Sequence, residues 1–382
     1  MKKIQTKGVK ISSNKDYRDS IVDILKKMLP SKSVDAVLIP MRVPAKDSYA
    51  WILVKDEKLL TEADPVAPIM PIQGARALSS FSRKGESMLK IAALMRPCEI
   101  RAAIELSKLN QVNLENVTLI SYDCPGALPM GDYLNEPEKG EKKFKDILKK
   151  LDFQNKSIKP VCKICDQFSL LPVSDLHFTL FHDQNNTMFL IANSNRGNQV
   201  LKEIGMEASH TVSAWAKGIQ EISDKRAAQK KGRFTQIKKM VEGFDSLLAT
   251  FSDCIGCHNC QSACPICYCR QCYFDSESVT SGTDLTMLKA KKRGSISLPQ
   301  NRIMFQVGRM SHMSLSCVSC GLCTDACPVS IPVAEIFSYV AHNTQKQFSY
   351  SSGENKGEPI PLKTFKLEEV KGIQELVEDA EA

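Results

Sequence analysis

The chain has 382 residues, of which 43% are hydrophobic and 25% are charged. This is the composition of an ordinary globular protein, and a length of about 150 residues per domain predicts two or three domains. The net charge of +8 comes from 51 basic and 43 acidic residues, and the basic runs are spread along the chain. A nucleic-acid footprint is usually concentrated and interleaved with aromatics. We therefore expect solvated basic faces that dock to acidic partner proteins, and no nucleic-acid binding.

The sequence predicts a cytoplasmic protein without a membrane span. No apolar run reaches the length of about eighteen residues that a spanning helix needs. Lys2 and Lys3 are not followed by the apolar segment of a secretory signal. Cytosolic thiols stay reduced, so the fifteen cysteines, clustered and odd in number, indicate metal ligation and not a disulfide framework.

The N-terminal third alternates between predicted helices and strands. The first predicted elements are a helix at 17–29 and strands at 34–43 and 51–54. A strand at 89–95, a turn, a helix at 99–109 and a strand at 117–122 follow. A strand, helix and strand in this order form a crossover connection, so we expect the two strands to be parallel.

Further along the chain the pattern changes. Residues 177–182 and 188–192 read as a hairpin with an amide-rich turn. Residues 214–251 are predicted to be largely helical, with a break at Lys-Lys-Gly 230–232. After about 345 the chain is rich in Ser, Gly, Lys and Glu, which predicts a mobile tail or an arm that orders against a partner.

An internal repeat is the most informative feature. Residues Cys254 to Pro265 recur in spacing as Cys317 to Pro328, and both match C-x2-C-x2-C-x3-C-P. In this pattern three cysteines hold one 4Fe-4S cubane and the fourth ligates the other. The predicted ligands are Cys254, Cys257, Cys260 and Cys327 for the first cubane, and Cys317, Cys320, Cys323 and Cys264 for the second. Structural zinc is the rival interpretation, but zinc ribbons separate two cysteine pairs, whereas each repeat packs three ligands into seven residues.

Two smaller cysteine groups leave alternatives open. Cys267, Cys269 and Cys272 either hold a further site, completed by a residue such as His258, His312 or Asp275, or are packed thiols beside the first cubane. Cys98 and Cys124 follow two neighbouring predicted strands, where α/β sheets place ligand sites. With Cys162 and Cys165 they either form a cage for a third 4Fe-4S cluster or are merely buried free cysteines.

Particular motifs resemble known families. The segments 96–102, 119–126, 162–168 and 174–176 resemble the beta subunits of hydrogenases and dehydrogenases that use a deazaflavin coenzyme. The block 254–272, followed by 298–306 and 309–317, is similar in order and spacing to the beta subunit of archaeal-type formate dehydrogenase. The likeness covers roughly residues 35–345.

The resemblance has implications for cofactors and partners. It implies that Cys98, Cys124, Cys162 and Cys165 ligate a third cluster. It also implies a redox partner, either a large molybdenum or tungsten catalytic subunit or a heterodisulfide-reductase-like assembly. Members that bind flavin have glycine-rich segments, yet here only Gly8 precedes Gly74 and no glycine lies between Gly140 and Gly197. Since a flavin phosphate needs close backbone approach, we do not expect tightly bound FAD.

We therefore predict an α/β N-terminal domain with one cluster at 1–210, a helical connector at 211–250, an α+β ferredoxin-like domain with two 4Fe-4S clusters at 251–345, and a tail or partner-binding arm at 346–382. The predicted function is an iron-sulfur electron-transfer subunit of a hetero-oligomeric anaerobic oxidoreductase, with three clusters and no catalytic residues of its own. The alternatives are a flavin-containing subunit that oxidises or reduces a deazaflavin or nicotinamide coenzyme, and a structural zinc protein.

Overall fold

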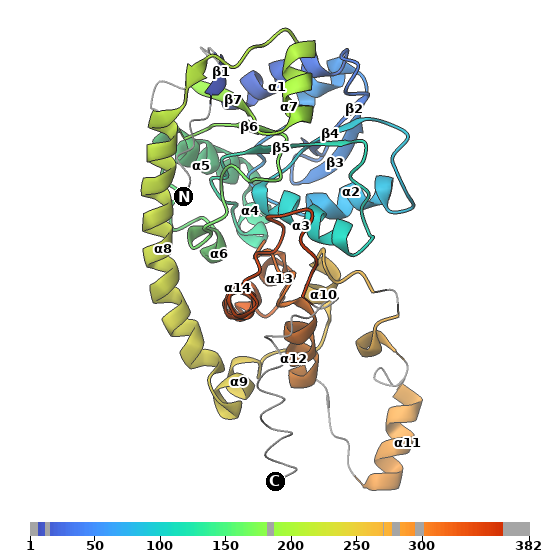
Figure 1. Cartoon of the computed structure of the whole chain (residues 1–382). Helices are drawn as coiled ribbons and strands as arrows, with labels where there is room; N and C mark the ends of the chain where they lie inside the picture. The colour runs from blue at the N-terminus through green and yellow to red at the C-terminus, as the bar shows by residue number, and fades with distance from the viewer. Residues whose placement is uncertain are drawn as a thin grey trace, which may run out of the picture.

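The computed structural model describes residues 7–11, 16–181, 187–269, 271–276, 283–294 and 302–361. A mixed sheet with its helices forms the N-terminal part, and a group of helices from the C-terminal part lies at one end of it (Figure 1). One long helix, α8, runs along the side of both parts. Among the described residues, no helix has the length and apolar character needed to cross a membrane.

The strands are β1 Lys7–Ile11, β2 Ala36–Arg42, β3 Tyr49–Val54, β4 Ile91–Leu94, β5 Val117–Tyr122, β6 Leu176–Phe178, β7 Met188–Ala192 and β8 His210–Thr211. The helices up to the connector are α1 Tyr17–Met28, α2 Gly74–Ser82, α3 Pro97–Lys108, α4 Met130–Asn135, α5 Pro137–Lys150, α6 Pro160–Lys163, α7 Asn195–Glu203 and α8 Ser213–Val241. The later helices are α9 Phe244–Thr250, α10 Asn259–Ala263, α11 Thr283–Arg293, α12 Arg302–Met313, α13 Leu322–Asp325 and α14 Val333–Gln347. Two 3-10 helices, η1 Glu57–Glu62 and η2 Tyr273–Asp275, complete the described elements.

The described strands form one sheet in the order β3-β2-β4-β5-β6-β7-β1-β8. β2, β4, β5 and β6 are parallel neighbours, and the outer strands pair antiparallel. The predicted crossover through α3 is confirmed, because β4 and β5 are parallel with Ile91 opposite Val117. The predicted hairpin is confirmed by the antiparallel pairing of β6 with β7, although residues 182–186 of its turn lie outside the described residues. The mixed α/β class is confirmed, whereas the domain boundaries stay a prediction.

Successive side chains of the central strands point alternately into two hydrophobic cores. Ala92 and Leu94 of β4 belong to the core that α1 covers, whereas Ile91 and Ala93 belong to the core with α2 and α3. This follows from the two-residue side-chain period of a strand. The second core also contains Ile266, which directly follows the first cysteine repeat, and Val318 of the second repeat. The repeats therefore pack directly on the sheet domain.

The predicted helix break at 230–232 is wrong. α8 is continuous from Ser213 to Val241. A glycine inside a helix costs only about 1 kcal/mol. Phe234 and Ile237, which follow the expected break, are buried, and this packing holds the helix together through the exposed Gly232.

The prediction of a mobile or partner-bound tail after 345 is wrong for residues 346–361. α14 continues to Gln347, and Tyr350, Ser352 and Ile360 are buried within the chain itself. Composition predicted disorder here because the segment has few large apolar groups, but hydrogen bonds to α3 hold it. Residues 362–382 lie outside the described part.

Candidate metal centres

The two cysteine repeats have loops of the same backbone conformation. In the first repeat, Gly256 and His258 have positive φ angles of 67° and 56°. In the second, Ser319 and Gly321, at the equivalent positions, have φ angles of 56° and 89°. Non-glycine residues adopt such angles rarely. The matching φ angles therefore indicate that both repeats need the same loop conformation. Turns at the third and fifth positions curl each loop, as the predicted ligation of one cubane by its first three cysteines requires.

The second repeat lines a pocket together with the last cysteine of the first repeat. The cysteines that share this pocket are Cys264, Cys317, Cys320 and Cys323. A hydrogen bond from the Cys267 thiol is the main reason that the pKa of Cys264 is lowered to about 6. Burial raises the pKa of the other three thiols, Cys317, Cys320 and Cys323, so these would be deprotonated only with positive charge beside them. Four thiols thus border one concave space, as ligation of a cubane requires, and the ligand assignment itself stays a prediction.

The first repeat is contacted by polar groups of α12. Arg309 Nη1 lies 3.0 Å from Cys260 Sγ, and its Nη2 donates to the Cys260 carbonyl oxygen at 3.1 Å. Gln306 Nε2 lies 3.6 Å from Cys254 Sγ. Arg309 is only 3% exposed and lies over the ring of Phe337. These donors suit an anionic cluster, because hydrogen bonds to the ligand sulfurs orient the ligands and adjust the reduction potential of the cluster.

The remaining ligand predicted for the first cubane is Cys327, which packs against the same hydrophobic cluster as Cys254. Cys254 and Cys260 are buried, whereas Cys257 is exposed. The charges of Cys254 and Cys257 both act on Cys260, so these thiols lie near one another. The first site therefore reaches the surface at Cys257.

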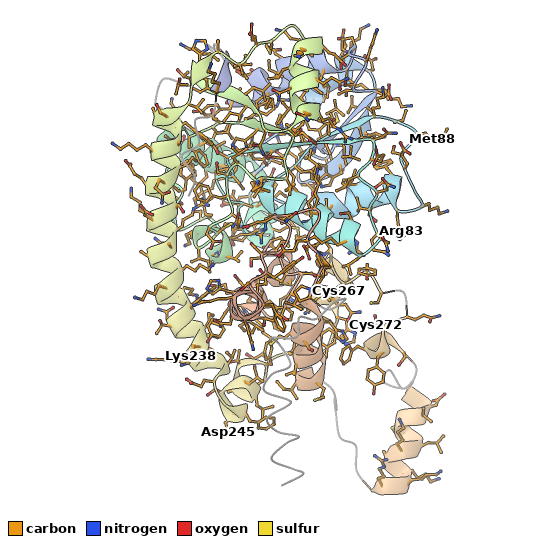
Figure 2. The ribbon with its side chains drawn as sticks, viewed as in Figure 1. Arg83, Met88, Lys238, Asp245, Cys267 and Cys272 are labelled. Carbon is orange, nitrogen blue, oxygen red and sulfur yellow. The ribbon has the colours of Figure 1, made fainter. Side chains whose placement is uncertain are left out.

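Cys267, Cys269 and Cys272 do not converge on a common point. Cys267 contacts Met313 Sδ at 3.4 Å, Cys269 is exposed, and Figure 2 shows Cys272 further out, on the side from which the chain leads to α11. His258, a possible fourth ligand, instead pairs with Asp275 at 2.8 Å. Among the described residues no three Cys, His, Asp or Glu side chains are close enough to hold a single metal ion.

The N-terminal cysteines lie where parallel strands end. Cys98 is in the first turn of α3, which begins directly after β4, and Cys124 follows β5. Pro97 suits the first turn because its missing N–H has no partner there. Glu99 completes the cap by accepting from the backbone N–H groups of Arg96 at 2.8 Å and Gly74 at 2.9 Å. The cap thereby fixes the helix that carries Cys98.

The thiols of this N-terminal group lie close together. Burial raises the pKa of Cys98 well above its usual value. The charges that add to this effect come from Glu99, Cys124, Cys320 and Cys165. Burial likewise raises the pKa of Cys162, with the Lys159 cation opposing and Cys124 adding to it. Burial raises the pKa of Cys165 to about 11. Such thiols would be deprotonated only with positive charge beside them, which a cluster's iron supplies.

A buried arginine tests whether the N-terminal group fits a cluster. Arg226 of α8 is 1% exposed, lies 4.1 Å from the centre of the Phe168 ring, and donates to the Cys165 carbonyl at 3.4 Å. Within the described part of the chain, its Nε and Nη2 have no hydrogen-bond partner. A buried cation is costly without compensating negative charge. A cluster with its thiolates is anionic, so the residues present fit this group.

Asp123 holds the loop that carries Cys124. Its carboxylate accepts from Trp215 Nε1 at 2.8 Å and from the Leu180 N–H at 2.9 Å, and lies 3.0 Å from His177 Nε2. Burial alone would raise the pKa of Asp123, but His177 and the hydrogen bonds lower it below its usual value. The ionised side chain thus ties the end of β5 to α8.

The N-terminal group adjoins the second repeat. A Cβ added to Gly321 would meet Val161 of α6 at 2.8 Å, so the two loops touch. Lys159 forms a buried ion pair with Asp325, which lies between two cysteines of the second repeat. The charge of Cys320 acts on Cys98. Two of the predicted cysteine sites are therefore immediate neighbours.

The spacing of the cysteines in the sequence identifies them as candidate ligands. No sequence pattern identifies the buried arginines beside them. Arg226 lies in a helix rich in Lys and Arg, and nothing in its neighbourhood distinguishes it from solvated residues. Arg309 belongs to a segment whose one sequence signal is its similarity in order to known subunits.

Comparison with known proteins agrees with this geometry. Residues 250–331 match the family described as 4Fe-4S dicluster domain. The chain has a dicluster ferredoxin module.

Two curated relatives span almost the whole chain. The F420-dependent formate dehydrogenase subunit beta of Methanocaldococcus jannaschii is 25% identical over 373 residues, covering 89% of this chain and 93% of the relative. The F420-dependent formate dehydrogenase 1 subunit beta of Methanococcus maripaludis is 26% identical over 377 residues, covering 90% and 92%. The predicted resemblance to formate dehydrogenase beta subunits is confirmed. These matches support an iron-sulfur electron-transfer subunit.

A chain of the xenon-derivatised F420-reducing [NiFe] hydrogenase complex from Methanosarcina barkeri also matches among solved structures. The TM-score is 0.44 at 11% identity, and the match covers 60% of this chain and 92% of that chain.

Proposed function

We propose that the chain relays single electrons through three 4Fe-4S clusters, two in the repeats and one in the N-terminal four-cysteine group. When bound, each cluster supplies a one-electron redox centre. The observation that carries the proposal is the direct contact between the N-terminal group and the second repeat, where Cys320 lies near Cys98. The unpartnered Arg226 cation beside Cys165 supports a cluster in the N-terminal group.

The burial of the thiols supports an order for the relay. Cys257 of the first repeat is exposed. By contrast, Cys98 and Cys320 lie at the junction between the two parts of the chain. Electrons would therefore pass to or from a partner at the first cubane, and the second cubane would connect it to the N-terminal cluster. In this scheme the chain's own residues hold the thiolates, exclude water and balance charge.

The partner is proposed to be another redox subunit, either a molybdenum or tungsten catalytic subunit or a heterodisulfide-reductase-like subunit. Both curated relatives are named as beta subunits, which supports a hetero-oligomer. A cytoplasmic location stays a prediction.

Iron content tests the number of clusters. The anaerobically purified chain should contain about twelve iron atoms, four for each cage. Changing Cys98→Ser together with Cys124→Ser should lower this to about eight, because the N-terminal cage loses half of its ligands. The control Cys269→Ser, which changes an exposed cysteine, should keep about twelve. About eight iron atoms in the unchanged chain would remove the third cluster.

A flavin-containing subunit remains the second candidate because the N-terminal part has a pocket of about 640 Å³. Small-molecule sites usually span about 300–1,000 Å³. Lys46, Lys145 and Lys149 line this pocket and could attract phosphates. Against this, Gly74 and Gly197 are pressed against Trp51 and the Asp175 backbone, so neither offers open backbone to a cofactor. Stoichiometric flavin released from the anaerobic chain by acid would favour this second candidate.

A further inference from the structure

The segment after α14 fastens the two parts of the molecule together. We define residues 350–353 as the C-terminal strap. Tyr350 Oη donates to Glu105 Oε1 at 2.6 Å, and the Gly353 N–H donates to the same oxygen at 2.8 Å. Glu105 is fully buried on α3. Gly353 has a φ of 74°, and a Cβ there would meet Arg101 Cα at 2.4 Å. The strap thus lies directly on the helix that begins with Cys98.

Ser352 connects this helix to the second repeat. Its hydroxyl accepts from Arg101 Nη2 at 2.8 Å and donates to the Cys317 carbonyl oxygen at 3.0 Å. The Ser352 carbonyl accepts from Arg101 Nε at 2.7 Å. Ser352 has no exposed surface. One buried hydroxyl therefore joins α3, three residues after Cys98, to the backbone of a predicted cubane ligand.

We propose that Ser352 is a positioning residue, whose hydroxyl sets the separation between the N-terminal cluster and the second cubane. This inference rests on the proposed three-cluster relay. Electron tunnelling weakens steeply with distance, so a relay needs a fixed separation between its centres. The hydroxyl provides this because it bridges a donor on the N-terminal side and an acceptor on the ferredoxin side.

The strap has a second anchor that makes the hydroxyl testable by itself. Glu105 binds Tyr350 and Gly353 without involving Ser352. Gln345 Nε2 also donates to the Cys317 carbonyl at 3.0 Å, so that oxygen keeps a partner when the serine hydroxyl is removed. Removing the hydroxyl should therefore leave the strap attached to α3 and loosen the joint between α3 and Cys317, where Arg101 Nη1 still donates to the Val318 carbonyl at 3.4 Å.

The test compares S352A with S351A in the full chain. The Ser351 hydroxyl makes no hydrogen bond within the described residues, so its loss is a matched control in the same strap. Iron content should be unchanged in both variants. Paramagnetic resonance of the dithionite-reduced chain should show magnetic coupling between the N-terminal cluster and the second cubane. We expect this coupling to be weaker and less uniform in S352A and unchanged in S351A. Superimposable spectra of S352A and unchanged protein would overturn the inference.

A second variant covers the case in which S352A does not fold. R101K keeps the cation, but an ammonium cannot donate to both oxygens of Ser352 in the way a guanidinium fork does. We expect the same weakened coupling, and its absence would again overturn the inference. The two proposals fail differently. A chain with no N-terminal cluster would overturn both, whereas a three-cluster chain whose coupling ignores Ser352 and Arg101 would overturn only this one.

Discussion

Buried arginines accompany the cysteine sites. Arg309 lies beside Cys260, Arg226 beside Cys165, and Arg96 Nη1 lies 3.8 Å from Cys124 Sγ. The guanidinium stays protonated and is more weakly hydrated than an ammonium, so it tolerates burial better. Each cation would offset the negative charge that the thiolates of the proposed clusters bring into the interior. The arginines are therefore part of the charge balance of the proposed sites, as the cysteines are.

Replacing Arg309→Gln should make the first cubane harder to reduce. Reduction adds negative charge to the cluster, and the Arg309 cation stabilises that charge. Loss of one charged hydrogen bond, worth about 1.4 kcal/mol, corresponds to about 60 mV for one electron. Redox titration followed by paramagnetic resonance measures the shift. The same substitution at exposed Arg293 should leave the potential unchanged, and an unchanged R309Q potential would contradict the role given to Arg309.

At this scale, the sequence was informative about ligands and silent about their surroundings. The spacing of Cys254 to Pro265 predicts cluster chemistry because successive thiolates must return to one centre at short intervals. Arg226 lies on α8, whereas the carbonyl to which it donates belongs to Cys165, 61 residues earlier in the chain. No local pattern encodes such a contact.

α8 shows how packing overrides a local signal. Lys230, Lys231 and Gly232 are exposed or half-buried, yet the helix passes through them without interruption. The ion pair between Arg233 and Glu335 of α14 fastens the helix to the ferredoxin module directly after this stretch. Figure 1 shows α8 spanning from the sheet to α9, and Figure 2 marks its far end with Lys238. The helix is a strut between the two parts.

Replacing Gly232→Ala should stabilise the chain by about 0.5–1 kcal/mol, because alanine restricts the unfolded state and suits a helix interior. A Cβ at this position meets nothing within 4 Å. Gly243 is the matched control: a Cβ there also has open space, but its φ is 82°. Thermal unfolding should show a higher midpoint for G232A and a lower one for G243A. A lower midpoint for G232A would mean that the helix needs glycine flexibility there.

Elements with strong apolar periodicity were predictable, and weak ones were not. The strands at 34–43 and 117–122 correspond to β2 and β5, because buried central strands carry continuous apolar residues. β8 has only two residues, both exposed, so it has no hydrophobic pattern. The segment beyond α14 is held by side-chain hydrogen bonds to α3, and composition does not report these.

The sheet part and the region of the cysteine repeats pack against each other through a shared core. Ile266, directly after the first repeat, and Val318 of the second repeat join the core beneath β4 and β5. The buried Lys159–Asp325 ion pair joins the loop before α6 to the second repeat, with side-chain exposures of 4% and 6%. Breaking such a pair leaves an uncompensated buried charge. The joint between the two parts therefore depends on both apolar and ionic contacts.

Replacing Asp325→Asn should destabilise the folded chain by about 3 kcal/mol, because Lys159 would keep a buried charge without its partner. Unfolding of samples with full iron content measures this loss. Glu136→Gln, which removes a partner from the exposed Lys139–Glu136 pair, should have little effect. Equal stability of D325N and unchanged protein would show that the Lys159–Asp325 pair does not hold the joint.

The strap also determines when the two parts of the chain can be joined during synthesis. Ser352 follows Cys317 by 35 residues and Arg101 by 251 residues. A ribosome makes the chain from its N-terminus, so every cysteine emerges before the residue that joins α3 to the second repeat. The joint therefore cannot form until all of these cysteines have been synthesised. The strap is a latch that can close only after every cysteine of this sequence has emerged from the ribosome.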